Sequence, residues 1–536
     1  MGRSALLALA RGTGVHLGAL TAVLAERYGD RPAVIDPTPT PGFDHHGESR
    51  SFVEVEDAVG RLATLQREHG IGPDDRVMIV CDNRIDVGLH AFAAARLGAI
   101  SVPVNHRLTA HEIDAIAEAT DAVAAIVDDE VLDRIPDRLR VLKVSEVAER
   151  AASAEHLVAP DDLDPRATAI LLTTSGTTGV PKAASLTSKG LLSTLGRLTV
   201  VPLGADLGPL RRDRDAILAC LPLTHVMGFS VLLASLSAGI PLIRRVRFDA
   251  AEALDLIERH QPNIVVAVPT MYADLERAGA ADRDLSSIQI FVSSADVLPS
   301  DRARRLQRAG AFGRVAGRSF GTAVVVDIFG MVELSGPAAV RLYPPSPVGS
   351  IPAPSFAVTL PGVEVRVVGE DGRPLPRGEI GELQWHGPNV LEGYEGHHEE
   401  GPDAEGWFGS GDNGRLLRAG MFQFAGRSKD RLKVGGFSVF PAEVEDALDG
   451  ADGVAELAIV GIEDERLGER LVAVVAAKDG FDQDRFLAWA RGQVAGYRRP
   501  SEVVIVDGIP RGNNGKVDRS AATELASRAL DGAEVT

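Results

Sequence analysis

The sequence predicts an α/β protein: a large N-terminal domain of parallel αβ sheets with an antiparallel β subdomain, followed by a small α+β C-terminal domain. Three observations support this fold class. Short β-branched runs alternate with helical patterns over the first part of the chain, hairpin-like segments follow Gly336, and a second α+β pattern begins near Gly426–Asp430. At 536 residues the chain is too long for one ordinary core, so a large domain with at least one smaller domain is expected.

The parallel sheets are predicted from apolar runs that alternate with helical segments. Arg76–Cys81 is a β-branched run, Val87–Leu97 is rich in alanine, and Ala99–Val104 is again strand-like. The same alternation recurs along the chain at His111–Ala119, Val123–Val127, Ala216–Leu221, Ser230–Ser237, Pro241–Arg244, Ala251–Arg259, Ile264–Val268 and Ile288–Val292. Strands that alternate with helices favour parallel sheets covered on both faces.

Two apolar stretches have the length or position of a membrane span or an export signal. No Asp, Glu, Lys or Arg lies between Asp215 and Arg244, which is long enough to span a bilayer. Its prolines, glycines and serines instead predict a strand, a loop, a buried helix and a loop toward a second strand, so no transmembrane span is expected. At the N-terminus, Ser4–Ala10 continues into Val15–Leu24 at helical spacing, which favours an amphipathic helix over a signal peptide.

The antiparallel subdomain and the C-terminal domain are predicted from the later segments. Val363–Val368, Gly381–His386, Gly414–Leu417 and Met421–Ala425 are separated by Gly, Pro and acidic turns, as in hairpins. Beyond the boundary, Pro441–Leu448 and Asp484–Val494 are predicted as helices, and Val454–Gly461 and Leu471–Ala477 as strands. The expected domains are therefore residues 1–428 and 429–536.

Composition disfavours several kinds of partner, location and metal site. With 56 Lys+Arg and 75 Asp+Glu the formal net charge is -19, which disfavours nucleic acid or an anionic membrane as the main partner but leaves room for a local basic cleft. Two cysteines, Cys81 and Cys220, are too few for a disulfide framework, so a cytoplasmic location is expected. The pairs His45-His46 and His397-His398 have no ligand-spaced partner and are interpreted as solvated loops rather than metal sites.

The strongest chemical signal is a hydroxyl- and glycine-rich loop after the apolar run Ala169–Leu172. It contains Thr174, Ser175, Gly176, Thr177, Thr178 and Gly179 and ends at Lys182. Glycines let backbone N–H groups approach an anion, hydroxyls add donors and the lysine adds charge, so a phosphate site is predicted. The spacing differs from a Walker loop, and the plain alternative is a polar turn.

With this loop, the sequence resembles a known family, the adenylate-forming superfamily of acyl-CoA synthetases, peptide-synthetase adenylation domains and luciferases. The resemblance covers about Val15 to about Ala522, and its motifs occur in the family's order. They are Thr174–Lys182, Pro222–His225, Phe329–Glu333, Gly406–Phe408 with Ser410–Asp412, Gly426–Lys433 and Pro510–Lys516. The resemblance implies ATP, Mg²⁺ and coenzyme A as cofactors and a small C-terminal domain that is mobile.

The resemblance also implies roles for four charged residues. Asp412 would bind both ribose hydroxyls, Glu333 would hold Mg²⁺ against the ATP phosphates, and Arg427 would contact ribose or phosphate. Lys516 would stabilise charge on the attacking carboxylate and the α-phosphate. Taken singly, each has a plain alternative, such as a turn aspartate, a glutamate at a helix start, or a solvated Arg or Lys.

The resemblance places the adenine and acyl sites as well. Ser293, Ser294, Ala295 and Asp296 occupy the place of the family's small-residue loop beside adenine, and Phe329 and Gly330 belong to the nucleotide motif. His225 would gate the acyl pocket and touch the carboxylate. An equally good alternative is a core histidine whose hydrogen bonds are made within the protein. Tyr272, Met227 and Phe229 are candidate pocket walls that an ordinary core would use equally well.

A second half-reaction is implied by the C-terminal motifs. Lys429 matches the hinge about which the C-terminal domain swings between adenylating and thioester-forming poses. Gly435 and Gly436 match the close backbone approach that admits the pantetheine arm, with a strand-end turn as the alternative.

Three departures from the family pattern stand out. Val332 replaces a threonine whose hydroxyl supports the α-phosphate, which would remove a bond worth about 1.5–3 kcal/mol. The stretch Phe312–Asp327 is longer than usual, and Ala183 replaces a glycine after the loop lysine.

The sequence therefore predicts an acid:CoA ligase: a carboxylate and ATP form an acyl-adenylate, and the CoA thiol then displaces AMP. The acid is expected to be hydrophobic, because no obvious Lys or Arg counter-charge accompanies the apolar pocket. Two alternatives are a partial enzyme limited to one half-reaction, because of Val332, and a non-catalytic acyl- or nucleotide-binding homologue. A carrier-protein thiol in place of CoA, and the oligomeric state, stay open.

Overall fold

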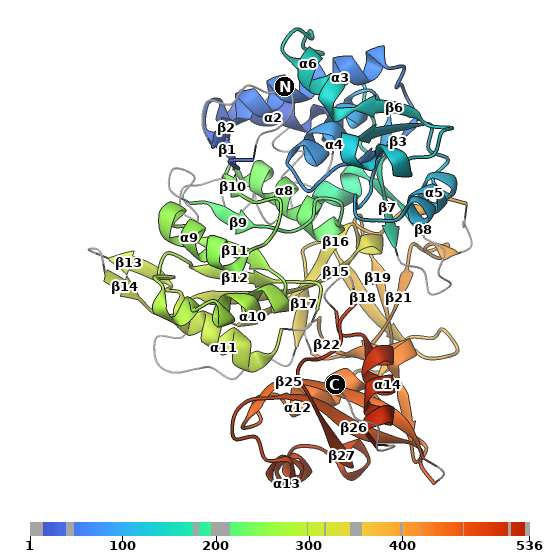
Figure 1. Cartoon of the computed structure of the whole chain (residues 1–536). Coiled ribbons are helices and arrows are strands. Elements are labelled where there is room, and N and C mark those ends of the chain that lie inside the picture. Colours follow the sequence, from blue (N-terminus) through green and yellow to red (C-terminus); the bar gives the residue numbers. More distant parts are fainter. Residues whose placement is uncertain are drawn as a thin grey trace.

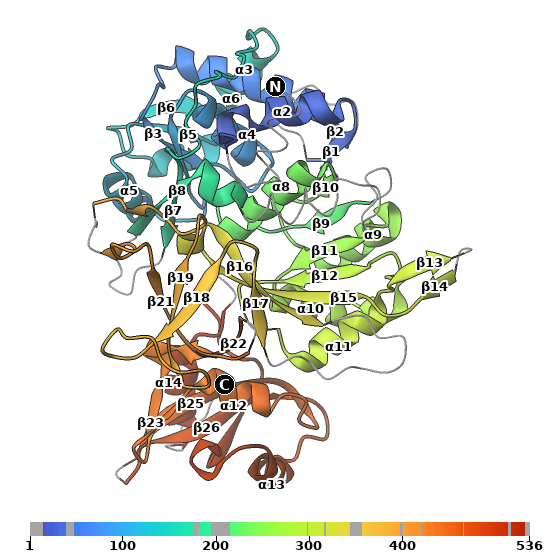
Figure 2. The same ribbon diagram turned by 180° about the vertical axis from the view of Figure 1, so that it is seen from behind.

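The computed structural model describes residues 14–38, 48–174, 182–193, 215–296, 298–315, 318–343, 356–396, 400–418, 420–464, 466–512 and 516–530. The molecule is built in tiers, with the N-terminal helices at one end and a small sheet with the C-terminal helix at the other (Figures 1 and 2). Two larger sheets with helices between them form the body.

The smaller of these two sheets uses the apolar runs near the N-terminus. Its strands are β3 (Arg76–Val80), β4 (Ile100–Pro103), β5 (Ala124–Val127), β6 (Arg140–Lys143), β7 (Thr168–Thr174), β8 (Lys182–Thr187) and β20 (Gly393–Tyr394). They lie in the order β20-β8-β7-β4-β3-β5-β6. The pairs from β7 to β6 are parallel, whereas β8 pairs antiparallel with both β7 and β20. The predicted strands at Arg76–Cys81, Ala99–Val104 and Val123–Val127 are confirmed.

The larger sheet joins parallel and antiparallel strands. Its strands are β1 (Pro32–Ile35), β2 (Ser49–Ser51), β9 (Ile217–Ala219), β10 (Leu242–Ile243), β11 (Ile264–Ala267), β12 (Ile290–Ser293), β15 (Val324–Met331), β16 (Gly336–Tyr343), β17 (Ala357–Thr359), β18 (Glu364–Val368), β19 (Gly381–His386), β21 (Phe408–Leu416) and β22 (Met421–Arg427). Their order is β18-β19-β21-β22-β17-β16-β15-β12-β11-β9-β10-β1-β2. The strands from β1 to β15 are parallel, and those from β15 to β18 are antiparallel. The predicted hairpins are therefore continuous with the parallel sheet.

Helices cover both sheets. They are α2 (Leu17–Tyr28), α3 (Phe52–Glu68), α4 (Asp86–Arg96), α5 (Ala110–Ala119), α6 (Val144–Ala151), α8 (Val226–Ala238), α9 (Ala250–His260), α10 (Pro269–Arg277) and α11 (Ser300–Ala309), with short 3₁₀ turns η1 (Asp129–Arg134) and η2 (Ala280–Asp282). Capping boxes start α3, with Ser51 and Glu54, and α5, with Thr109 and Glu112. The expected N-terminal helix is α2, which begins at Leu17 after its N-cap His16, and residues 4–10 lie outside the described residues.

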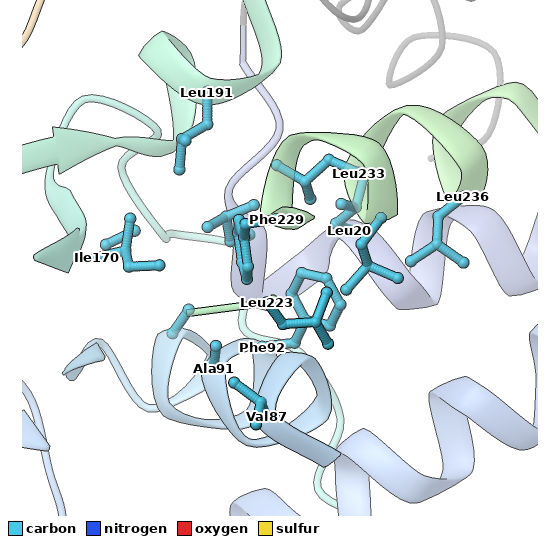
Figure 3. Close-up of a cluster of buried hydrophobic side chains, with 14 of the residues drawn as sticks. Leu20, Val87, Ala91, Phe92, Ile170, Leu191, Leu223, Phe229, Leu233 and Leu236 are labelled. Carbon is cyan, nitrogen blue, oxygen red and sulfur yellow. The ribbon is translucent and has the colours of Figure 1, made fainter. Parts of the chain in front are cut away.

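The main core lies between the two sheets. Alternate residues of β11 point to opposite faces, Ile264 and Val266 into this core and Val265 into the core beneath α9, α10 and α11. Figure 3 shows Phe229 and Leu233 of α8 packed near Phe92 of α4 in the main core. Burying both faces of parallel strands requires the nearly continuous apolar runs seen in the sequence.

The charge-free stretch after Asp215 is part of this body. It forms β9, α8 and β10, as expected, and twelve of the thirteen residues of α8 are buried. Within the part of the chain described, no helix is long and apolar enough to cross a membrane.

The long stretch Phe312–Asp327 forms a small hairpin, β13 (Gly313–Val315) and β14 (Arg318–Phe320), that projects from the end of the larger sheet (Figure 1). Phe312 and Phe320 face each other at 6.0 Å on its surface.

A third sheet is formed by the last part of the chain. Its strands are β23 (Leu432–Val434), β24 (Phe437–Val439), β25 (Val454–Asp464), β26 (Gly468–Ala477) and β27 (Glu502–Val506), with α12 (Pro441–Ala447), α13 (Gln483–Gln493), α14 (Arg519–Leu530) and the turns η5 (Ser428–Asp430) and η6 (Gly496–Arg498). Alternate residues of β26 face two cores, one with α12 and α13 and one with α14. The predicted α+β pattern of the C-terminal part, and with it the α/β fold class, is confirmed.

Candidate active site

The predicted phosphate loop connects two neighbouring strands. β7 and β8 are antiparallel, and Thr174 pairs directly with Lys182, so the two ends of the loop meet at the end of one hairpin. Thr174 is half-buried there. The loop residues Ser175, Gly176, Thr177, Thr178 and Gly179 lie outside the described residues, and their phosphate contacts stay a prediction.

The loop lysine lies close to the predicted metal-binding glutamate. Lys182 forms an ion pair with Glu400, and its ammonium lies 6.0 Å from the ring centroid of Tyr394. Strand β20 places Tyr394 opposite Ala184 of β8, and the tyrosine hydroxyl donates a hydrogen bond of 2.8 Å to Glu333 Oε1. Tyr394 thus connects two charged residues that the sequence predicted separately.

The glutamate motif adopts a tight backbone. Glu333 is only 8% exposed and lies in the short turn η3 (Val332–Leu334), immediately after β15. A Cβ at Gly330 would lie 2.3 Å from the carbonyl oxygen of Gly336, so only glycine fits at this bend. The half-buried Val332 packs against the edge of the main core, and Phe329 stacks on Trp385 at 5.0 Å.

The predicted ribose-binding pair lies on adjacent strands. Asp412 of β21 is directly opposite Arg427 of β22, with 3.4 Å between Asp412 Oδ1 and Arg427 Nε. Burial raises the pKa of Asp412 to about 6, while the positive charges of Arg427 and Lys516 oppose that rise. The carboxylate is buried and the guanidinium is exposed, so the pair is open to solvent on the arginine side only.

Lys516 lies at the centre of these groups. Burial lowers the pKa of Lys516, and the charge of Arg427 lowers it further, whereas Asp296 and Asp412 raise it. Desolvation by the surrounding protein lowers the pKa of His225, and the positive charge of Lys516 lowers it further. One lysine near the C-terminus therefore interacts with residues from three separate regions of the preceding chain.

His225 has a structural role as well as its place beside Lys516. Its Nδ1 accepts a 3.3 Å hydrogen bond from the backbone N–H of Met227 and so caps α8. His225 is nevertheless exposed as a residue, so the core-histidine alternative does not describe it. With the pKa below its ordinary value of 6.5, the imidazole is neutral at pH 7.

The candidate pocket walls are buried. Phe229 lies near Phe92 in the main core (Figure 3), and their ring centroids are 6.0 Å apart. The hydroxyl of Tyr272 lies 3.0 Å and 2.8 Å from the carbonyl oxygens of Val265 and Val292. The alternative of ordinary core residues therefore fits Phe229 and Tyr272.

The loop beside the predicted adenine site follows β12. Ser294 is fully buried, and its Oγ has no hydrogen-bond partner in the described part of the chain. Ala295 takes a left-handed conformation with φ of 74°, and Asp296 lies 3.9 Å from Arg511. The aspartate of this loop thus faces a residue of the C-terminal part of the chain.

The residues predicted for the second half-reaction, Lys429 and the pair Gly435 and Gly436, lie in two different turns. Lys429 is exposed in the turn η5, where the chain passes from β22 to β23. Gly435 and Gly436 form the two-residue turn between β23 and β24, with φ of 58° and 85°. Two successive residues with positive φ favour glycine, so the strand-end alternative accounts for the pair, and the pantetheine contact stays a prediction.

The single carboxylate of Glu333 suits a magnesium ion that is held chiefly by the substrate. Over the described residues no three His, Cys, Asp or Glu side chains are grouped as a metal site. Mg²⁺ commonly binds one carboxylate with waters and substrate phosphates, and a single buried glutamate fits that chemistry.

Sequence reasoning missed two residues of this region, Tyr394 and Glu400, because no local pattern marks them and each meets its partner through long-range contacts. Arg511 belongs to the predicted motif Pro510–Lys516, but its contact with Asp296 was not predicted.

Comparisons with known proteins agree with this geometry. The family models described as AMP-binding enzyme and AMP-binding enzyme C-terminal domain match residues 22–395 and 443–516. A feruloyl-CoA synthase of an Amycolatopsis species is 34% identical over 484 residues, covering 88% of this chain and 93% of that relative. The indoleacetate–CoA ligase of Aromatoleum aromaticum is 30% identical over 522 residues, covering 93% and 97%. ATP-bound MatB from Rhodopseudomonas palustris has the same fold, with a TM-score of 0.77 at 27% identity over 96% of this chain and 100% of that one.

Proposed function

The chain belongs to the AMP-binding enzymes and is an acid:CoA ligase, and we propose that the acid it activates is a bulky, largely apolar aromatic carboxylic acid. The names of two relatives, a feruloyl-CoA synthase and an indoleacetate–CoA ligase, support the aromatic class. Helix α8, which begins directly after His225, supports the apolar character, because it contains no charged residue.

The reaction has two steps and uses ATP, Mg²⁺ and CoA. A carboxylate oxygen attacks the α-phosphorus of ATP and releases pyrophosphate, giving the acyl-adenylate. The thiolate of CoA then attacks the acyl carbonyl, the bond to AMP breaks, and the thioester forms. Both steps place negative charge where positioned cations stabilise it.

The observation that carries the adenylation step of this proposal is the position of Lys516. It lies near Asp412, Arg427 and His225, where an ATP ribose and an acid carboxylate would meet. A cation in this half-buried place stabilises the charge that passes from the attacking carboxylate to the α-phosphate. Neutral His225 next to it admits the carboxylate without adding a second fixed charge.

The other charged residues bind the nucleotide in this proposal. Asp412 accepts hydrogen bonds from the ribose hydroxyls, and Arg427 holds the aspartate in place. Glu333, oriented by Tyr394, would hold Mg²⁺, and the ion would supply positive charge to the phosphates. Lys182 binds the phosphates once they displace Glu400 from its ion pair.

Both half-reactions belong to the proposal. The relatives are named as CoA ligases and align over nearly their full length, so a partial enzyme or a non-catalytic homologue is not favoured. We take CoA rather than a carrier-protein thiol as acceptor for the same reason. Val332 then makes adenylation slower without abolishing it, since one donor to the phosphate is missing.

We also propose residues 1–428 and 429–536 as the two domains, with Lys429 at the hinge. The separate match of the C-terminal family model and the two small cores of that part support this division.

We further propose a cytoplasmic location. The use of ATP and a reduced thiol supports it, as do the two free cysteines, Cys81 and Cys220.

The test is a panel of acids. Ferulate, indole-3-acetate, decanoate and acetate are each incubated with ATP, Mg²⁺ and CoA, and AMP and thioester are quantified. The expected order of kcat/KM places the two aromatic acids above decanoate and acetate. Higher activity with decanoate would overturn the aromatic class, and AMP without thioester for every acid would overturn CoA as the acceptor.

A further inference from the structure

Helix α11 lacks a cap from its own segment. It starts after Pro299, whose side chain has no hydrogen-bonding group, and no side chain at its N-cap position accepts a hydrogen bond. The first N–H groups of a helix have no partner within the helix, so they need acceptors from elsewhere.

Asp449, from the C-terminal part of the chain, supplies that acceptor. Its Oδ2 accepts a 3.0 Å hydrogen bond from the backbone N–H of Asp301, and the backbone of Ser300 contributes another. A carboxylate at a helix N-terminus also interacts favourably with the helix dipole. The helix start of one predicted domain is thus capped by a residue of the other.

A second contact lies beside the first. Arg341 of β16 donates 2.8 Å and 2.9 Å hydrogen bonds to Asp327 Oδ2 and to the Leu298 carbonyl, and its other terminal nitrogen lies 3.8 Å from Asp446. Asp446 and Asp449 both lie around the end of α12. The loop that leads into α11 therefore meets two acidic residues of the C-terminal part.

The end of α12 is linked to the catalytic lysine by charged pairs. Glu445 of α12 makes a two-pronged contact with Arg519 at 2.7 and 2.9 Å, three residues after Lys516. Arg511, which lies before Lys516, pairs with Glu456 of β25 at 3.1 Å. Motion of α12 away from α11 would therefore carry Lys516 with it.

We propose that Asp449 is a positioning residue for adenylation: by capping α11 it holds the C-terminal domain in the pose that places Lys516 in the active site. This inference rests on the proposed function, because it assigns one pose to one half-reaction. Release of the cap frees the domain for the thioester-forming pose. The cap stabilises only the first pose, so its loss shifts the balance between the two half-reactions.

The test compares Asp449→Ala with Asp449→Asn and Asp452→Ala. Asn caps helices about as well as Asp, so Asp449→Asn should keep the ratio of the two half-reactions near that of the wild type. Asp452 is a matched control, since it is exposed and pairs with Arg485 of the same small domain. Pyrophosphate exchange with ferulate measures adenylation, thioester formation from synthetic feruloyl-adenylate measures the second step, and hydrogen exchange of the peptide containing Ser300 and Asp301 measures the cap itself.

Asp449→Ala should lower the ratio of adenylation to thioester formation by about 2- to 30-fold, the range for losing a helix cap. Exchange at the start of α11 should speed up, while Asp449→Asn and Asp452→Ala stay near wild type. Equal loss of both activities, or unchanged exchange, would overturn the proposal. A wild-type enzyme inactive on ferulate would instead refute the proposed acid, and hydrogen exchange, which needs no substrate, would then decide the role of Asp449.

Discussion

Replacing Tyr394 with phenylalanine should weaken Mg²⁺-dependent adenylation through Glu333. The tyrosine hydroxyl donates to Glu333 Oε1 at 2.8 Å, and the two residues are only 7% and 8% exposed. Phenylalanine keeps the ring, so the packing beside Lys182 is retained. Only the donor to a buried carboxylate is lost.

The magnitude follows from that one bond. A hydrogen bond to a charged group contributes about 1.5–3 kcal/mol, which corresponds to roughly a 10- to 150-fold change in an equilibrium or rate. Loss of a residue that orients a metal ligand has effects of about 10- to 100-fold. We therefore expect pyrophosphate exchange to fall by at least about tenfold at low Mg²⁺ and to recover in part at high Mg²⁺.

The assay measures pyrophosphate exchange across a Mg²⁺ titration, together with thioester formation from supplied acyl-adenylate, which should change little. Tyr28→Phe is the matched control, because Tyr28 is 8% exposed and its hydroxyl donates to the Ser237 carbonyl at 3.0 Å. An unchanged Mg²⁺ dependence in Tyr394→Phe, or the same shift in Tyr28→Phe, would refute the role of Tyr394 in orienting Glu333.

Four further predictions concern Lys516, Lys429, Val332 and Asp412. Lys516→Ala should abolish pyrophosphate exchange but spare thioester formation from supplied acyl-adenylate; equal loss of both would contradict its role. Lys429→Pro should do the reverse, because proline fixes φ and restricts rotation at the hinge, and a wild-type rate of CoA product would argue against that position. Val332→Thr should raise the exchange rate about tenfold, whereas a lower melting temperature without a gain would mean that the new hydroxyl is buried without a partner. The KM for ATP should rise as the pH falls through about 6, where Asp412 becomes protonated, and this rise should be absent in Asp412→Asn. Because burial raises the pKa of Asp412 in the folded state, its contribution to stability is present at low pH and lost as the pH rises through about 6, which thermal melts of the two proteins would show.

Local pattern determined most of the secondary structure. The apolar runs that became β3, β4, β5 and β11 are buried on both faces, and such runs are visible without any partner in view. The paired glycines at Gly435 and Gly436 likewise predict a tight turn, because two successive residues with positive φ favour glycine. The motif residues Glu333, Asp412 and Lys516 were found because they stand in recognisable local strings.

Only the tertiary structure decided how these pieces meet. The predicted hairpins could have formed a separate sheet, but β15 and β16 join them to the parallel strands, and strand pairing of this kind depends on partners distant in sequence. For the same reason Tyr394 escaped prediction: its hydroxyl reaches Glu333 because β20 pairs with β8, although strands β9 to β19 lie between the two in the sequence. Asp449 is an ordinary acidic residue in the sequence, and it becomes a helix cap only because the C-terminal part packs against α11. Local propensity acts over a few residues, whereas these contacts arise from the burial of surfaces that the chain brings together from far apart.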